Sequence, residues 1–116
     1  KNYEVFVRSI FLQGLLFNKF SNTHKYFKKY KLDLIKYSKF LDYYNITPLE
    51  ACIYYIFSIN LKLNIVFGAN DLSNIIEIYK TINNIDRKKI KKINFSEIKS
   101  KKIKLYNPLY WKIKQW

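Results

Sequence analysis

The sequence has few of the residues that mark disulfide-rich or metal-binding proteins. It contains one cysteine, one histidine, two glycines, two prolines and no methionine in 116 residues. A single cysteine excludes a disulfide framework within the chain and is typical of a reducing compartment, so we predict a cytoplasmic location. The lone histidine, His24, has no cluster of Cys, His or acidic residues around it, and we predict no metal site. No apolar run reaches the roughly 18 residues that a membrane-spanning helix requires, so we predict no membrane partner.

Acidic residues are also scarce. The chain has 22 Lys and Arg against 8 Asp and Glu, a formal net charge of +14. Such an excess usually indicates a nucleic-acid or anionic-membrane partner. However, the other abundant residues are Asn, Ile, Tyr and Phe, whose codons, like those of Lys, are rich in A and T. This shared bias accounts for much of the lysine excess, and a lysine-rich solvated surface is the simpler interpretation.

The length and composition predict one folded domain at most. A chain of 116 residues with 49% hydrophobic and 19% aromatic residues is too apolar to be a disordered tail. A chain of this size buries roughly two-thirds of the surface that it exposes when unfolded. Cys52 lies in an apolar helical pattern with no His or acidic residue spaced to pair with it, which predicts a small buried side chain and no nucleophile.

Two stretches run from a strand pattern into a turn with a glycine. Residues 3–17 (YEVFVRSIFLQGLLF) carry Gly14, and residues 64–79 (NIVFGANDLSNIIEIY) carry Gly68 before an amphipathic helix. The first is apolar on both sides at its middle, which predicts a strand covered on both faces, as in a parallel sheet. A glycine turn between a strand and a helix places backbone N–H groups where an anion binds. We therefore predict half of a cofactor site here.

Two helices are predicted between these stretches. Apolar residues three or four apart predict a helix from residue 26 that ends at Asn45. Its inward stripe consists of Phe27, Tyr30, Leu34, Tyr37 and Leu41. Residues 47–50 (TPLE) form a capping box with proline at the first helical position. The helix they open, to about residue 58, is apolar nearly all round, which predicts burial against a sheet.

The pattern after Gly68 predicts a third helix and then weakens. We expect Asn70 or Asp71 to cap this helix. Its predicted inner face consists of Leu72, Ile75, Ile76 and Tyr79. Residues 86–92 predict a charged turn or short helix, residues 99–104 an exposed basic segment, and residues 107–116 an irregular tail packed on a surface. The fold class is α/β, with two parallel strands, about three main helices and an irregular C-terminal tail. Two such strands leave both edges open, so we predict a fragment of a larger sheet or barrel.

Four motifs in these elements resemble those of the aldo-keto reductase family. Residues 8–16 (RSIFLQGLL) resemble the penultimate barrel strand and following loop of a bacterial branch, and residues 47–51 (TPLEA) resemble the start of its next helix. Residues 66–77 (VFGANDLSNIIE) resemble its last strand and helix, and residues 107–111 (NPLYW) its N-P-x-x-W ending. The resemblance implies the C-terminal fragment of a TIM (β/α)8 barrel, residues 1–116, with residues 84–116 as an extension packed on that barrel.

The same resemblance implies a function. It indicates the cofactor-binding part of an NAD(P)H-dependent oxidoreductase that reduces a small carbonyl substrate to an alcohol. The family's catalytic Asp, Tyr, Lys and His come from earlier strands, so no catalytic residue is assigned and the fragment alone should be inactive. The implied contacts to NADP or NAD are Ser9, Phe11, Gln13, Gly14, Gly68, Ala69, Asn70, Asp71, Asn74 and Glu77, with Ile78 at a further position near the adenosine. Arg8 replaces an aromatic residue that often stacks on the nicotinamide, and Asn74 stands where a longer Arg or Gln often contacts the 2′-phosphate.

The alternative function is a basic nucleic-acid-binding or interaction module without catalysis. Such a module would gather its lysines on one face with aromatic residues among them. The lysines are scattered over all segments, and we expect most tyrosines at inward helix positions. Both features argue against nucleic acid as a partner.

Overall fold

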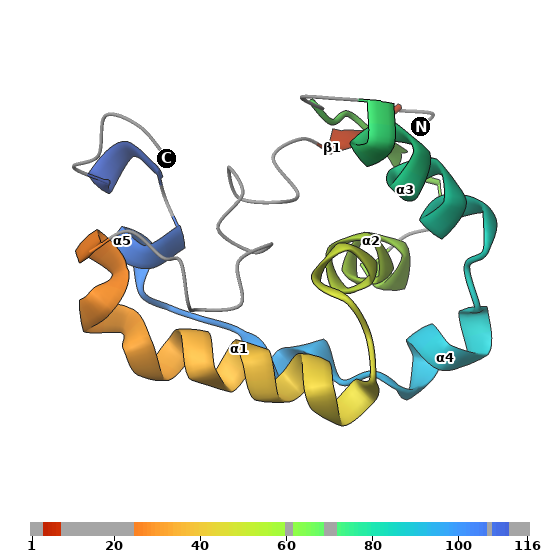
Figure 1. Ribbon diagram of the computed structural model, residues 1–116. Coiled ribbons are helices and arrows are strands. Elements are labelled where there is room, and N and C mark those ends of the chain that lie inside the picture. Colours follow the sequence, from red (N-terminus) through yellow and green to blue (C-terminus); the bar gives the residue numbers. More distant parts are fainter. Residues whose placement is uncertain (1–3, 8–24, 60–61, 69–71, 107, 112–116) are drawn as a thin grey trace.

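The computed structural model describes residues 4–7, 25–59, 62–68, 72–106 and 108–111. These residues form a mixed α/β structure that is mostly helical, with two parallel strands and five α-helices (Figure 1). The strands are β1 (Phe6–Val7) and β2 (Asn64–Ile65). The α-helices are α1 (Lys31–Tyr44), α2 (Pro48–Ile59), α3 (Leu72–Asn83), α4 (Arg87–Lys92) and α5 (Ile103–Tyr106). Short 3₁₀ helices are η2 (Lys25–Tyr30), η3 (Phe95–Ile98) and η4 (Pro108–Tyr110).

The two strands pair in parallel, as the sequence predicts. Phe6 lies beside Asn64 and Val7 beside Ile65. The Asn64 N–H donates to the Val5 carbonyl at 2.9 Å, and the next ladder bond, from the N–H of Val66 to the Val7 carbonyl, is 2.8 Å long. Parallel strands need a long crossover, and here α1 and α2 both lie in the chain between β1 and β2.

The prediction that the first strand is covered on both faces is wrong for the residues described. Val5 and Phe6 point to opposite faces of the sheet, and their side chains are 47% and 62% exposed. Val66 and Phe67, which directly follow β2, are exposed as well. The physical reason is the small size of the sheet, because two strands of two residues each present little surface for a helix to pack on.

The predicted inward stripe before Asn45 is confirmed, although its first turns are 3₁₀ rather than α-helical. All of its members are buried except Tyr37, which is half-buried, and Phe40 joins them. Asn45 ends α1 with φ 51° and ψ 52°, in the left-handed region that a residue after a helix often adopts. Its N–H donates to the carbonyls of Asp42 and Leu41. The lysines off this stripe, at positions 28, 29, 36 and 39, are exposed.

The capping box at the start of α2 is confirmed. The Glu50 N–H donates to the Thr47 hydroxyl at 3.1 Å, and the Thr47 N–H donates to the Glu50 carboxylate at 3.0 Å. The Tyr54 hydroxyl donates to the same carboxylate at 2.9 Å. Partial burial by itself would raise the pKa of Glu50, but these hydrogen bonds outweigh it and hold the pKa below its usual value. The box therefore fixes both the start of α2 and the charge of Glu50.

Helix α2 is buried, but other helices cover it instead of the predicted sheet. Its buried residues are Ala51, Cys52, Ile53, Tyr54 and Ile56, and the Ile53 side chain is completely buried. It packs against α3 and α4, and it shares the main hydrophobic cluster with the C-terminal half of α1. Figure 1 shows α2 end-on between α1, α3 and α4. Three neighbouring helices cover the apolar surface of α2, because the two-stranded sheet is too small to cover it.

The prediction for the inner face of α3 is wrong. Leu72 and Tyr79 are 69% and 67% exposed, and Ile75 and Ile76 are exposed too. Ile78, only 4% exposed, is the residue of α3 that enters the main cluster. Ile82, one turn later, packs against the same cluster. The helix has apolar residues on two faces, and α2 covers the face that carries Ile78.

The C-terminal segments divide between two hydrophobic clusters. The main cluster takes Ile90 of α4 and Ile93, and η3 is tied to α1 because the Asn94 N–H donates to the Tyr44 hydroxyl at 3.1 Å. The short helix predicted within residues 86–92 is present as α4, with Asp86 as its N-cap. A second cluster consists of Phe27, Tyr30, Leu34, Leu105 and Trp111. It lies at the other end of α1 from α2 and α4 (Figure 1).

Replacing Thr47 should measure the value of the capping box. We expect Thr47→Ala to lower the free energy of unfolding by about 1 kcal/mol, because the Glu50 N–H at the start of α2 loses the hydroxyl that accepts its hydrogen bond. Thr81→Ala is the matched control, since that hydroxyl only bonds the Glu77 carbonyl within α3; its effect should stay within about 0.5 kcal/mol. Urea denaturation followed by circular dichroism gives both values, and equal losses would contradict a special role for Thr47.

Candidate functional site

The candidate site that the structure describes lies where β2 leads into α3. Gly68 follows β2 by three positions and precedes α3 by four. It is exposed, and a Cβ built on it meets no heavy atom within 4 Å. Its φ lies outside the left-handed region. Neither the packing of the described residues nor the backbone conformation therefore requires glycine here, and the open side of this residue is accessible to a ligand.

Two other predicted contact residues are exposed on α3. Asn74 and Glu77 are three positions apart in the first two turns, a spacing that puts them on neighbouring parts of one helix face. The Glu77 carbonyl accepts a hydrogen bond from the Thr81 hydroxyl at 2.8 Å, and its carboxylate side chain is at the surface. An exposed amide and carboxylate offer hydrogen-bond partners for hydroxyl or amino groups. The start of α3 carries the partial positive charge of the helix dipole, which favours an anion nearby.

Ile78 does not belong to this site. The resemblance to aldo-keto reductase motifs implies a position near the adenosine, but the Ile78 side chain is buried in the main cluster beside α2. A ligand at the surface of α3 cannot reach it without unpacking the core. The burial follows from its position on the face of α3 that α2 covers, roughly opposite the exposed Ile76.

The remaining predicted contacts lie outside the described residues. They are Ser9, Phe11, Gln13, Gly14, Ala69, Asn70 and Asp71. His24 and the predicted capping position of α3 fall outside them as well. Of the ten predicted cofactor contacts, the structure therefore describes Gly68, Asn74 and Glu77, and it places all three on the surface at the β2–α3 junction.

The exposed tyrosines are a surface feature that sequence reasoning missed. The expectation that most tyrosines face inward is wrong, because several are exposed in the described residues: Tyr43, Tyr55, Tyr79, Tyr106 and Tyr110. One signal was available at positions 43 and 44, since two adjacent residues on a helix cannot both face the same core. Lysine also lies against tyrosine in this structure: the Lys29 ammonium is 4.4 Å from the centre of the Tyr26 ring and 5.3 Å from that of Tyr30.

Cys52 is buried next to Tyr37. Burial raises the pKa of the Cys52 thiol to about 12, although a hydrogen bond with Tyr37 opposes the shift. Burial and the neighbouring thiol also raise the pKa of Tyr37 well above its usual value. A thiol with so high a pKa is almost wholly protonated at neutral pH, and the thiolate is the reactive form. The geometry agrees with the sequence in giving Cys52 a packing role.

Three further findings concern metal binding, membrane-spanning helices and similarity to known proteins. Within the described ranges, no three His, Cys, Asp or Glu residues lie close enough to hold a metal ion. No helix among the described residues is long and apolar enough to cross a membrane. Comparisons with protein-family models, with curated proteins and with solved structures give no match.

The burial of Cys52 has a direct chemical consequence. At pH 8 its thiolate fraction should be about 10³-fold smaller than that of an ordinary cysteine, because its pKa is raised to about 12. We therefore expect a thiol-specific reagent to modify the native chain at least about 10³-fold more slowly than the urea-unfolded chain. The reagent reports on Cys52 alone, since the chain has one cysteine. Rapid modification without urea would contradict the packing role.

Proposed function

We propose that this chain is the C-terminal, cofactor-binding part of an NAD(P)H-dependent aldo-keto reductase-like oxidoreductase. On this proposal its two strands are neighbouring strands near the end of a TIM barrel, and a small carbonyl compound is the substrate of the whole enzyme. The proposal rests on the four sequence motifs together with the architecture around Gly68. Parallel strands joined through α1 and α2 are the connection that successive barrel strands require.

The observation that carries the proposal is the open side of Gly68. Glycine stands at a position where an added Cβ would meet nothing in the described structure and where φ lies outside the left-handed region. A requirement for close approach by an external group explains such a glycine, and a dinucleotide phosphate near the start of α3 is such a group. Without a Cβ at position 68, the backbone and the phosphate can come closer together than they could beside a side chain.

The exposed residues of α3 fit the sugar and base of the same cofactor. Glu77 can accept hydrogen bonds from ribose hydroxyls or from an adenine amino group, and Asn74 can both donate and accept. The nicotinamide cofactor supplies the hydride for carbonyl reduction when bound. The role of these residues is to hold and orient it.

We expect the 116-residue chain to bind the cofactor without turning it over. The proposal assigns no catalytic residue to this chain, because the Asp, Tyr, Lys and His of the family come from earlier strands. Mixing the chain with NADPH and an aldehyde should therefore leave the NADPH absorbance unchanged, while NADPH fluorescence should change on binding.

Gly68→Ala separates a ligand role from a folding role. We expect the free energy of unfolding to stay the same or to rise by up to about 1 kcal/mol, because alanine fits the space and restricts the unfolded chain. NADPH affinity should fall roughly 10-fold, since the new methyl group displaces the phosphate at a cost of about 1–3 kcal/mol. Fluorescence titration of NADPH and urea denaturation measure the two effects on the same samples.

Asn74→Ala and Asn83→Ala form a matched pair on α3 for this titration. Both residues are exposed, and they lie at opposite ends of the helix. Asn74→Ala should weaken NADPH binding about fivefold, the effect of one hydrogen bond, whereas Asn83→Ala should leave it unchanged. No NADPH binding by the wild-type chain, or equal affinity in all three variants, would sink the cofactor proposal.

The second candidate function, binding of a nucleic acid, is favoured by the exposed tyrosines. Tyr43 is 79% exposed on α1, one turn after the exposed Lys39, so a ring for base stacking and a cation for phosphate share one helix face. The net charge of +14 supplies the long-range attraction. The exposed lysines of the described residues are nevertheless distributed over η2, α1, α3 and α4 and do not gather on one element.

This second candidate predicts binding of a labelled single-stranded oligonucleotide that weakens steeply as salt is raised. Tyr43→Ala should weaken it by roughly 10-fold or more, because stacking of one base is worth about 1–3 kcal/mol. Tyr43→Phe is the control and should bind as the wild type does, since the ring remains. Fluorescence polarisation measures both, and a chain that shows no binding at low salt does not have this function.

A further inference from the structure

The second hydrophobic cluster is separate from the main one. It joins residues near the start of the described helical region, Phe27, Tyr30 and Leu34, to Leu105 and Trp111 from near its end. None of these residues belongs to the main cluster around α2. In Figure 1, η2, α5 and η4 lie together at one end of α1, and α2, α3 and α4 lie toward the other. Among the described α-helices, α1 contributes residues to both clusters and the others to one alone, which allows one cluster to open without the other.

The segment that closes the second cluster is called here the C-terminal strap (residues 99–106 and 108–111). It begins directly after η3, which is anchored to α1 through Tyr44. At its other end the Trp111 ring meets the Phe27 ring edge-to-face, with 4.8 Å between the ring centres. The Trp111 indole N–H donates to the Leu105 carbonyl at 3.0 Å, so the strap folds back on itself around this anchor.

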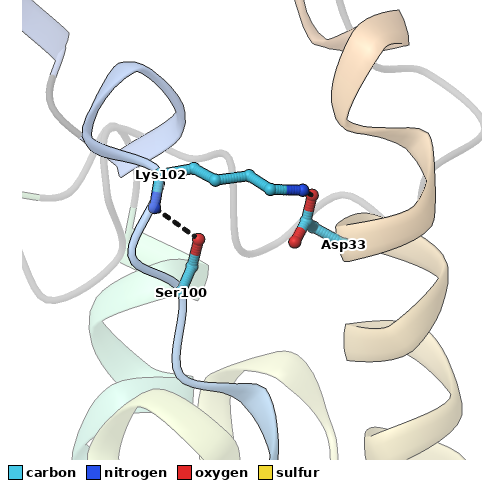
Figure 2. A network of polar contacts seen from close by, with 3 residues as sticks. All are labelled: Asp33, Ser100 and Lys102. Carbon is cyan, nitrogen blue, oxygen red and sulfur yellow. Dashed lines mark hydrogen bonds and ion pairs between the residues drawn. The ribbon is translucent and has the colours of Figure 1, made fainter.

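The polar contacts that hold the strap are made by side chains. Figure 2 shows the Lys102 ammonium at 2.7 Å from the Asp33 carboxylate, and the Lys102 N–H donating to the Ser100 hydroxyl. The Tyr26 hydroxyl donates to the Lys104 carbonyl at 2.8 Å. The Lys102 side chain is 56% exposed, and an ion pair as accessible as this contributes little to stability. Docking therefore depends mainly on burying Leu105 and Trp111.

We propose that the C-terminal strap is a detachable cover that opens as one unit while the main cluster stays folded. Its opening removes Leu105 and Trp111 from the cluster that they form with Phe27, Tyr30 and Leu34 on η2 and the start of α1. A small cluster closed by side chains opens at a lower free energy than a core that four helical segments share. The strap thus controls whether Leu105 and Trp111 cover this part of η2 and α1.

A tryptophan probe tests this on the full-length chain. The chain has two tryptophans, so Trp116→Phe leaves Trp111 as the sole one, and excitation at the red edge of the absorption band avoids the tyrosines. Fluorescence then reports the strap, and far-ultraviolet circular dichroism reports α1, α2 and α3. We expect blue-shifted emission in the folded chain and a fluorescence transition at a lower urea concentration than the circular dichroism transition.

Two buried-residue variants in this background locate the effect. Leu105→Ala should lower the fluorescence midpoint by roughly 1 M urea and leave the circular dichroism midpoint unchanged. Ile90→Ala in α4, equally buried but in the main cluster, should lower the circular dichroism midpoint. If Ile90→Ala does not fold, the proposal is still tested in the Trp116→Phe chain by whether the fluorescence transition precedes the circular dichroism transition. Coincident transitions in that chain, or equal shifts of both midpoints by Leu105→Ala, would overturn the proposal.

Discussion

The arrangement of this chain depends on the burial of α2, whose apolar side chains cover most of its circumference. A helix of that kind is stable only when several neighbours exclude water from it. The C-terminal half of α1, with α3 and α4, supplies that cover, and Ile53 at the centre is completely buried. The capping box fixes where the helix starts, and Asn45 in its left-handed conformation turns the chain from α1 toward it. Each contact of the main cluster follows from this requirement.

Local signals in the sequence were sufficient where one segment determines its own structure. The capping box at Thr47, the end of α1 at Asn45 and the stripe from Phe27 to Leu41 all involve residues within a few turns of each other, and all are found. The inner face of α3 could not be obtained in this way. That helix carries one apolar row through Leu72 and Tyr79 and another through Ile78, and only the position of α2 decides which is buried. The helical spacing of the apolar residues locates both rows but does not show which of them is buried.

The candidate site shows the same division between local and long-range information. Gly68, Asn74 and Glu77 were predicted as cofactor contacts from the motif resemblance, and the structure places them together on the surface at the β2–α3 junction. Ile78, one position beyond Glu77, was assigned to the site by motif position alone, yet α2 draws it into the core. The exposed tyrosines were missed for a related reason. A large aromatic residue is assumed to be buried unless the packing of its neighbours is known. Here five tyrosines lie outside the two clusters and are exposed.

The charge of the chain explains why the strap relies on apolar anchors. The strap carries four lysines, Lys99, Lys101, Lys102 and Lys104, and it docks on a stretch that contains Lys25, Lys28, Lys29 and Lys31. Asp33 is the acidic residue that meets one of these cations. Like charges on the two segments oppose docking, so the burial of Leu105 and the edge-to-face contact of Trp111 with Phe27 must outweigh that repulsion. The main cluster meets no such opposition at its centre, because α2 carries no lysine or arginine at all. The net charge therefore opposes docking of the strap, where two lysine-rich segments meet.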